Sequence, residues 1–475
     1  MAEAREQSAR TRLRGWLILA ALYALVVFVV PRPASVTPEG WRLAAIFLCV
    51  IVGMIVEPLP ASALVLLGLT AMTANGTPIK QALGGYAEPS VWLVILAMLI
   101  ARTMLDTGLA RRIALLFIHA FGRSSLGVSY ALLATDITLA SGVPSITART
   151  AGMIAPIAVR IADLFQSTPG PTANRLGAYL IAGIYQGSGV ACAMFFTGQA
   201  SNILGANLAR TLVQVEVSWS SWFVAAVVPG LASALVLPWV VQRVMRPEVR
   251  RTPEAPAFAA AELARMGPMS TAERITLAVF AGVGLLWMTS AWHRLDVTFV
   301  ALSGFGVLLI TGTLAWDTAM REKSAWDVFV WYGGLLRMGE LLNGTGVTTA
   351  FATSVGAVFT GIPWIIVLLA VLVVYFYTHY AFASITAHML ALFPPFVVLL
   401  VGLGVPPPLA VYSLLCLANL PAGLTHYGTT PAPILFGLGY VSLRDWWRVG
   451  FVVSLANMVL WLTVGFGWWK LIGLW

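Results

Sequence analysis

Residues 364–401 read WIIVLLAVLVVYFYTHYAFASITAHMLALFPPFVVLLV and lie inside a longer run, Leu341 to Leu443, that contains no aspartate, glutamate, lysine or arginine. A run of this length can cross a membrane several times, because one helix needs about 20 apolar residues to span the hydrocarbon core. The stretch 364–401 is too long, and too interrupted by its polar centre, for one straight helix. It therefore predicts a re-entrant hairpin with its tip near Ser384.

The composition of the whole chain is also that of a membrane protein. Of its 475 residues, 59% are hydrophobic and only 10% are charged, whereas a soluble domain carries roughly 25% charged residues. The net charge of +9 is too sparse for a nucleic-acid-binding surface, and Cys49, Cys192 and Cys416 are too far apart to suggest a disulfide framework. These values exclude a soluble enzyme and a nucleic-acid partner. They predict an all-α polytopic protein surrounded by membrane lipid.

One long polar linker, residues 246–271, divides the chain into two halves, 1–245 and 272–475. Together the halves predict about eleven transmembrane helices. The stretch 109–122 is left open between a crossing and an interfacial arm. The other segments expected are scaffold helices at about 13–122, a hairpin at about 127–160, a broken helix at about 177–210, a second hairpin at about 364–401 and a second broken helix at about 408–438.

The distribution of basic residues predicts the orientation. If both interrupted segments are hairpins, most arginines can lie on one side of the membrane, among them Arg123, Arg243, Arg246 and Arg448. The positive-inside rule makes that side cytoplasmic. We therefore expect a cytoplasmic N-terminus, an external C-terminus and a multi-pass protein of the cell inner (cytoplasmic) membrane. The apolar run after the N-terminal arginines is interpreted as a retained first helix.

Two short motifs occur once in each half at nearly equal spacing. Ser145-Ile146-Thr147-Ala148-Arg149 matches Ser384-Ile385-Thr386-Ala387-His388, and Thr107-Gly108-Leu109 matches Thr345-Gly346-Val347. With the predicted orientation, the two hairpins enter from opposite sides, which indicates an inverted repeat with a site near the midplane. Each Ser-Ile-Thr tip offers two hydroxyls and the free N–H groups of a helix N-terminus. Such a tip favours an anion.

Two further interruptions follow the hairpins. They read FTGQASN (196–202) and THYGTTPAP (425–433), where glycine and proline break the helices and free backbone groups to face a ligand. The hydroxyls of Thr197, Ser201 and Thr430 could equally bridge neighbouring helices. For Gly428 and Thr429 a place in the site is favoured.

These motifs resemble the divalent anion/sodium symporter family. Within it they are most similar to the branch that holds bacterial citrate/succinate antiporters and plastid 2-oxoglutarate/malate translocators. The resemblance implies eleven spans, two re-entrant hairpins, two broken helices, a homodimer and an elevator mechanism for di- and tricarboxylates. The motifs that carry it are PSITAR (144–149), AMFFTG (193–198), FASITAH (382–388) and LTHYGTTPAPI (424–434).

The resemblance also implies which residues hold the carboxylates, namely Ser145, Thr147, Ser384, Thr386, Gly198, Gly428 and Thr429. Ile146 and Ile385 stand where the family usually has asparagine, which places them at the substrate without an amide to donate. This change indicates a smaller or less polar substrate. His426 lies in the second broken helix and is expected to reach the substrate, whereas His379 is expected to be a structural residue.

Arg149 and His388 follow the two tips at equivalent positions. An arginine inside a span costs about 2.5–3.5 kcal/mol, so it needs a task or a partner. As fixed positive charges the two residues could replace sodium and make the empty carrier costly to move, which predicts obligatory exchange. Two alternatives stay open: an ion pair of Arg149 with Asp136, and a neutral His388 bonded to a carbonyl.

The sequence therefore predicts a secondary transporter, not an enzyme, that exchanges C4–C6 carboxylates such as succinate, malate, 2-oxoglutarate and citrate. No cofactor or metal is expected. The alternative is a sodium-coupled dicarboxylate symporter, in which Ser145, Gly198, Ser384 and Gly428 would hold sodium. A transporter of another divalent anion such as sulfate, or a membrane enzyme, is less favoured, since the acids are scattered. The pairs Arg102–Asp106 and Arg337–Glu340 are predicted to be local ion pairs outside the site.

Overall fold

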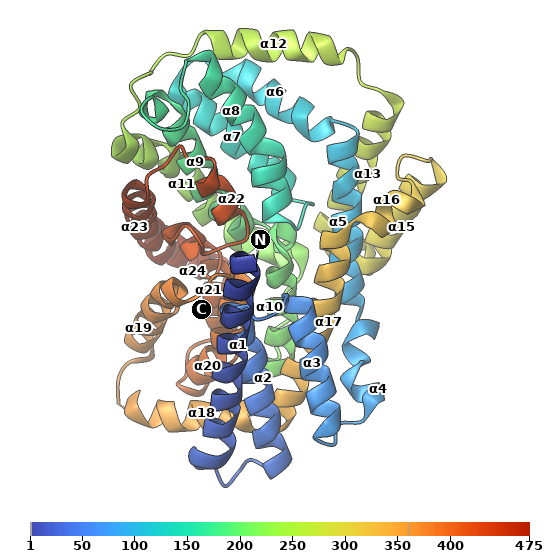
Figure 1. Cartoon of the computed structure of the whole chain (residues 1–475), viewed down its shortest axis with the longest axis vertical. Coiled ribbons are helices and arrows are strands. Elements are labelled where there is room, and N and C mark those ends of the chain that lie inside the picture. Colours follow the sequence, from blue (N-terminus) through green and yellow to red (C-terminus); the bar gives the residue numbers. More distant parts are fainter. Residues whose placement is uncertain (1, 360) are drawn as a thin grey trace.

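The computed structural model describes residues 2–359 and 361–475. Within these residues every regular element is a helix, apart from one isolated bridge between Ser124 and Arg251 (Figure 1). Nine of the described helices are long and apolar enough to cross a membrane, and shorter apolar helices such as α3 and α15 lie among them. The all-α polytopic fold predicted from the sequence is confirmed.

Some of the helices outside the hairpins and broken helices begin at a side-chain cap. Thr37 accepts a hydrogen bond from Gly40 N at 3.1 Å before Pro38 begins α2, and Ser270 caps α13 in a reciprocal pair with Glu273. These helices are α1 (Ala2–Ala24), α2 (Pro38–Val56), α3 (Ala61–Ala74) and α5 (Pro89–Asp106) in the first half, and α13 (Thr271–Met288), α15 (Val297–Ile310) and α17 (Lys323–Gly344) in the second.

One hairpin and one broken helix follow in each half, in the same order. The first half has the hairpin α7 (Ser125–Ala140) and α8 (Ala155–Leu164), then the broken helix α9 (Gly177–Met194) and α10 (Ala200–Val213), then α11 (Trp219–Met245). The second half has α19 (Trp364–Tyr377) and α20 (Ile385–Gly402), then α21 (Pro407–Leu417) and α22 (Pro431–Gly437), then α23 (Leu443–Leu460). The same order of elements in both halves is the inverted repeat.

The arms before the hairpins show the repeat most directly. Gly108 and Gly346 both adopt left-handed backbone, with φ of 81° and 78°, and each begins a short helix: α6 (Leu109–Phe121) or α18 (Val347–Gly356). A residue with a side chain would be strained at either position. The two arms lie at opposite ends of the molecule (Figure 1). Helix α6 is not among the described helices that are apolar and long enough to be candidate spans, which favours the arm for the stretch 109–122.

The polar linker is partly helical. Its helix α12 (Glu254–Met266) lies across one end of the molecule and packs against α6 (Figure 1). Arg112 of α6 is buried and pairs with Glu273 of α13 at 2.7 Å, so the arm is also tied to the second half. The linker helix is therefore packed against the first half, and the arm α6 is held against the second half.

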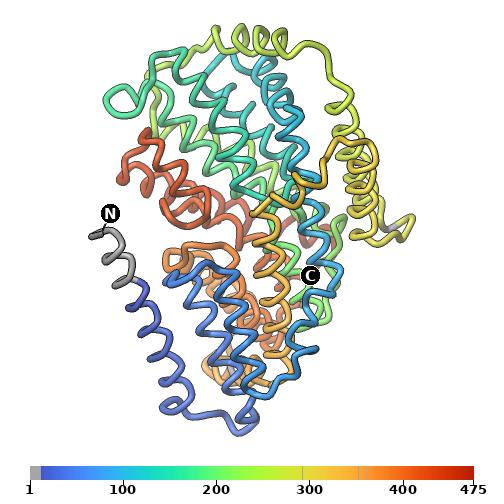
Figure 2. The backbone as a smooth tube through the Cα atoms, turned by 45° about the vertical axis from the view of Figure 1, so that its right-hand side comes forward, coloured from blue at the N-terminus to red at the C-terminus, as the bar shows by residue number. Residues whose placement is uncertain are grey.

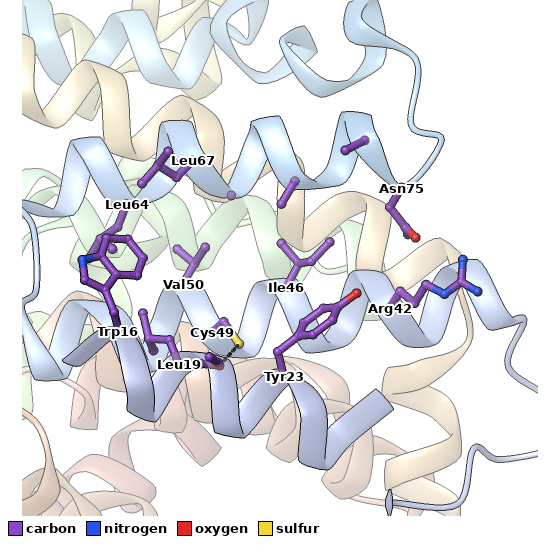
Figure 3. A pocket seen from close by; sticks show the side chains of 14 residues that line it. Trp16, Leu19, Tyr23, Arg42, Ile46, Cys49, Val50, Leu64, Leu67 and Asn75 are labelled. Atoms are coloured by element: carbon purple, nitrogen blue, oxygen red, sulfur yellow. Dashed lines mark hydrogen bonds between the residues drawn. The ribbon is translucent and has the colours of Figure 1, made fainter. Parts of the chain in front are cut away.

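The first helix stands at the edge of the fold (Figure 2). Between α1, α2 and α3 lies an open groove of about 620 Å³, with Trp16, Leu64 and Leu67 at one end and Tyr23 and Arg42 at the other (Figure 3). Its walls are largely apolar, and the outer face of α1 exposes Leu17 and Phe28. This face is suited to contact with lipid.

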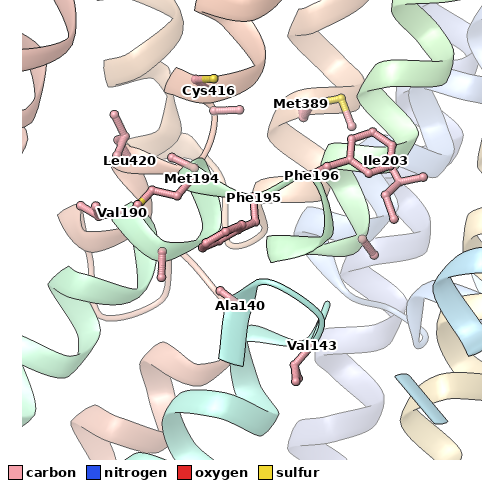
Figure 4. Close-up of a cluster of buried hydrophobic side chains, with 14 of the residues drawn as sticks. Ala140, Val143, Val190, Met194, Phe195, Phe196, Ile203, Met389, Cys416 and Leu420 are labelled. Carbon is pink, nitrogen blue, oxygen red and sulfur yellow. The ribbon is translucent and has the colours of Figure 1, made fainter. Parts of the chain in front are cut away.

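The core that seats the first hairpin is apolar. Val143 lies near the turn of the hairpin, and Phe195 and Phe196 lie at the break between α9 and α10, all buried in one cluster (Figure 4). Met389 of α20 belongs to the same cluster. Each hairpin thus packs against the broken helices, and α10 of the first half lies on α20 of the second.

Candidate functional site at the hairpin tips

The two serines at the hairpin tips cap the returning helices. Ser384 Oγ accepts a hydrogen bond from Ala387 N at 3.3 Å, and Ser145 Oγ accepts one from Ala148 N at 3.3 Å. Capping uses the oxygen as acceptor and leaves the O–H free to donate. The first helical amides at each tip have no intrahelical partner, so each tip presents a cluster of hydrogen-bond donors.

The other tip residues divide into two kinds. Thr147 and Thr386 are half-buried, whereas Ile146 and Ile385 are buried, with exposed fractions of 7% and 4%. The isoleucine side chains therefore pack into the protein, whereas the two threonines stay partly exposed. In this conformation each tip therefore combines serine and threonine hydroxyls with a buried isoleucine.

Arg149 is fully buried, and each nitrogen of its guanidinium group has a hydrogen-bond partner. Its Nε donates to Asp136 Oδ1 at 2.7 Å, and its Nη1 donates to the carbonyls of Val143 and Gly198 at 2.6 and 2.7 Å. Nη2 lies 3.2 Å from Cys192 Sγ. The ion pair that the sequence left as an alternative is present, so Asp136 compensates the guanidinium charge, and the arginine joins the hairpin to the first broken helix.

His388, the counterpart of Arg149, is also buried and bonds to a carbonyl. Its Nε2 lies 2.8 Å from Tyr375 O, and Tyr375 occupies the position equivalent to Asp136. His379 lies beside it, with ring centroids 5.0 Å apart, and its Nε2 is 3.0 Å from Gly428 O. Each Nε2 must carry the proton, because a carbonyl only accepts. Since neither Nδ1 has a partner among the described residues, both rings suit the neutral form.

The two glycines of the breaks therefore play equivalent parts. Gly198 O accepts from Arg149, and Gly428 O accepts from His379. A Cβ on Gly198 would lie 2.6 Å from Cys192 O, and one on Gly428 would lie 3.0 Å from Ala422 O. Both positions need glycine because backbone approaches backbone there.

The tip of the first hairpin reaches the second half. Thr147 Oγ1 donates to Thr430 Oγ1 at 3.1 Å, so the bridging role left open for Thr430 is observed. Thr197 bridges as well, donating to Ser141 O at 2.6 Å. Among the described residues, no hydrogen bond joins Ser384 or Thr386 to the first tip.

Ser145 faces helices outside the hairpins. It lines a small cavity of about 70 Å³ together with Arg102 of α5 and Glu322, which pair at 3.2 Å. Arg102 also pairs with Asp106 at 2.8 Å, as predicted, but it lies beside the site instead of away from it. A second cavity of about 510 Å³ shares Leu105 with the first and continues between the hairpin and α6, where Arg160 lines it.

Two predicted residues have other partners. Thr429 is buried, and its hydroxyl lies 3.1 Å from Tyr185 Oη. His426 is half-buried and accepts from Trp447 Nε1 at 3.3 Å within a group of aromatic rings. Neither side chain contacts a tip serine among the described residues.

Sequence reasoning missed Asn419, a buried polar residue that joins the two breaks. Asn419 donates to Asn202 Oδ1 at 3.0 Å and accepts from Gln199, while Asn202 donates to the carbonyls of Cys192 and Phe195. His379 was also expected to have no part in the site. Buried amide side chains inside otherwise apolar spans were the available signal.

The comparisons with known proteins agree with this architecture. The family described as "Sodium:sulfate symporter transmembrane region" matches residues 11–475. Dicarboxylate transporter 1, chloroplastic, of Arabidopsis thaliana is 39% identical over 97% of this chain and 83% of its own length. The citrate/succinate antiporter of Escherichia coli strain K12 is 31% identical over 97% of this chain and 98% of its own length.

A solved structure shares the fold. The YdaH transporter of Alcanivorax borkumensis aligns over 90% of this chain and 99% of its own with a TM-score of 0.55 and 15% sequence identity. Taken with the inverted repeat and the paired tips, the family match over nearly the full length shows that this chain is a multi-pass membrane transporter, not an enzyme, and that it belongs to the divalent anion/sodium symporter family.

Proposed function

We propose that this protein exchanges di- and tricarboxylates of four to six carbons across the membrane without sodium. Substrates of this class are named for similar proteins, a chloroplastic dicarboxylate transporter and a citrate/succinate antiporter. The tips suit such anions, because Ser145, Ser384 and Thr386 supply donors at the positive ends of two helices, and Thr147 could join them by releasing its bond to Thr430.

The proposal of sodium independence rests on the backbone carbonyls at the two breaks, which already have hydrogen-bond partners within the protein. A sodium ion at a tip would need backbone oxygens such as those of Gly198 and Gly428. Arg149 donates to the first at 2.7 Å, and His379 contacts the second at 3.0 Å. Two protein N–H donors therefore bind the oxygens that a sodium site would use.

Exchange follows from the electrostatics of the empty carrier. Each helix N-terminus carries roughly half a positive charge, and the two tips together carry about one. Moving that charge through a low-dielectric barrier is costly unless an anion compensates it. Because Asp136 already neutralises Arg149, the tips themselves carry the uncompensated field in this proposal.

The route of transport forms part of the proposal. The hairpins and broken helices would move as one body against α2, α3, α5, α13, α15 and α17 of a homodimer, an elevator movement. The cavity of about 510 Å³ along the first hairpin, lined by Arg111 and Arg160, would guide an anion toward Ser145.

Counterflow in proteoliposomes tests the proposal. Vesicles loaded with unlabelled malate should take up labelled succinate equally in sodium and potassium buffers, and empty vesicles should take up almost none. Unlabelled 2-oxoglutarate, citrate and sulfate in the external buffer would rank the substrates by competition. Sodium-dependent uptake into empty vesicles would contradict exchange and favour the alternative, sodium-coupled symport.

A further inference from the structure

A strongly basic hollow lies away from the hairpin tips, at the end of α11. It has a volume of about 810 Å³, and three arginines line it, Arg243, Arg246 and Arg250. A smaller hollow of about 210 Å³ shares Arg246 and adds Arg448 and Asp445. Among the described residues none of the four arginines forms an ion pair, and no acid lines the larger hollow.

The backbone around the hollow is held in place. Val249 N donates to Arg175 O at 2.9 Å, and Arg250 O accepts from Ser125 N at 3.1 Å, so the segment is tied to the ends of two other loops. Arg246 adopts left-handed backbone with φ 48°, a strained conformation for a residue with a side chain. The start of the linker therefore presents its arginines from a fixed surface.

Part of the lining of the hollow is apolar. Val240, Val244 and Val452 line it beside Trp239, and the Arg243 guanidinium lies 4.7 Å from the centre of the Trp239 ring. Helix α11 is long and apolar enough to cross the membrane, so its end lies at headgroup depth, where tryptophan and arginine are favoured.

We propose that this hollow binds an anionic phospholipid, with Arg243, Arg246 and Arg250 on its phosphate and its acyl chain along Trp239 and the valines. A free phosphate would use the arginines alone, whereas a lipid uses both the arginines and the apolar part of the lining. Arginine suits this ligand because its planar guanidinium binds phosphate oxygens in pairs. Basic pockets of this kind between membrane helices bind lipid headgroups.

Native mass spectrometry of the full-length protein in detergent tests the site. Titration with phosphatidylglycerol and phosphatidylcholine should show at least about tenfold preference for phosphatidylglycerol in the unmodified protein. The double variant Arg243→Gln/Arg250→Gln should weaken phosphatidylglycerol binding about 25-fold, about fivefold for each arginine. The control Arg265→Gln/Arg321→Gln removes the same charge from side chains that are 80% and 83% exposed, and it should keep the preference. Equal loss in both double variants, or equal binding of the two lipids, would overturn the proposal.

A measurement on the unmodified protein covers the case in which the variant does not fold. Phenylglyoxal modifies accessible arginines, and peptide mapping reports each one. Phosphatidylglycerol should protect Arg243 and Arg250 at least fivefold more than phosphatidylcholine does, while Arg265 and Arg321 react equally in both. Protection by inorganic phosphate as strong as that by phosphatidylglycerol would identify a site for free anions and refute a lipid site.

Discussion

At the scale of single residues, each tip serine caps a helix, and under the proposed function it also donates to the substrate. Ser145 and Ser384 accept from the backbone at 3.3 Å, and each O–H remains free to donate. A hydrogen bond from a neutral donor to a carboxylate contributes about 1.5–3 kcal/mol, more than the roughly 1 kcal/mol of a helix cap. The functional effect of losing such a serine should therefore exceed its structural effect.

Ser384→Ala should raise the half-saturating dicarboxylate concentration in counterflow about 10-fold or more, because one donor to the carboxylate is lost. Ser442→Ala is the matched control, since Ser442 caps α23 by accepting from Asp445 N at 3.1 Å and lies away from the tips. We expect that control to transport normally. Equal impairment in both variants would show that capping alone explains the serine.

Arg149 should prove important for stability. Arg149→Leu leaves the Asp136 carboxylate buried without its partner and should cost about 3–5 kcal/mol of unfolding free energy. The double variant Arg149→Leu/Asp136→Leu removes both charges and should recover at least half of that loss. Thermal unfolding in detergent measures both. A single variant as stable as the unmodified protein would show that the pair is dispensable.

At the scale of elements, the breaks depend on close backbone approach. The break at Phe196–Gly198 lies against the end of α9, and a Cβ on Gly198 would lie 2.6 Å from Cys192 O and 2.8 Å from its Cα. Backbone cannot rotate away as a flexible side chain can. The geometry that places Gly198 O against Arg149 therefore requires glycine at this position.

Gly198→Ala should lower the unfolding free energy by about 1–3 kcal/mol through overpacking, and it should impair exchange more strongly by moving the Gly198 carbonyl. Gly437→Ala, in α22, is the control, because a Cβ there meets nothing within 4 Å. That variant should be as stable as the parent or slightly more so. Normal exchange by Gly198→Ala would argue against a fixed carbonyl at the break.

At the scale of the whole molecule, the first hairpin meets the outer helices beside Ser145. Ala101 of α5 and Ala148 of the hairpin line the same small cavity, together with Arg102 and Glu322. In contrast, α3 and α17 contact each other away from the hairpins, where Ser62 donates to Asp327 O at 3.1 Å. Under the proposed elevator mechanism, the first contact joins a moving part to a fixed part, whereas the second joins two helices of the fixed part.

A disulfide between Ala101→Cys and Ala148→Cys should abolish counterflow, and a reductant should restore it, if the hairpin moves against α5. The control pair Ser62→Cys/Asp327→Cys joins α3 and α17, which the proposed mechanism places in the same fixed part, and it should leave counterflow unchanged when oxidised. Gel shifts report cross-link formation in each case. Normal transport by the fully cross-linked first pair would exclude an elevator movement at this contact.

The membrane class, the two hairpins and the two breaks could be read from the sequence, because each depends on local composition. Charge-free runs specify burial in lipid, and glycine and proline specify where a helix cannot continue. The repeat of Ser-Ile-Thr and of Thr-Gly located both tips and both arms. The motif residues Ser145 and Ser384 were therefore identified without knowledge of any contact.

The tertiary structure alone decided how these residues are used. Which partner Arg149 takes depends on where Asp136 and Gly198 lie in space, and the sequence allowed either a free charge or an ion pair. The role of His379 on Gly428, the link of Asn419 to Asn202 and the basic hollow at Arg243 likewise join segments far apart in the chain. Local pattern specifies where a helix starts and breaks, whereas electrostatic compensation inside a membrane depends on distances that only packing sets.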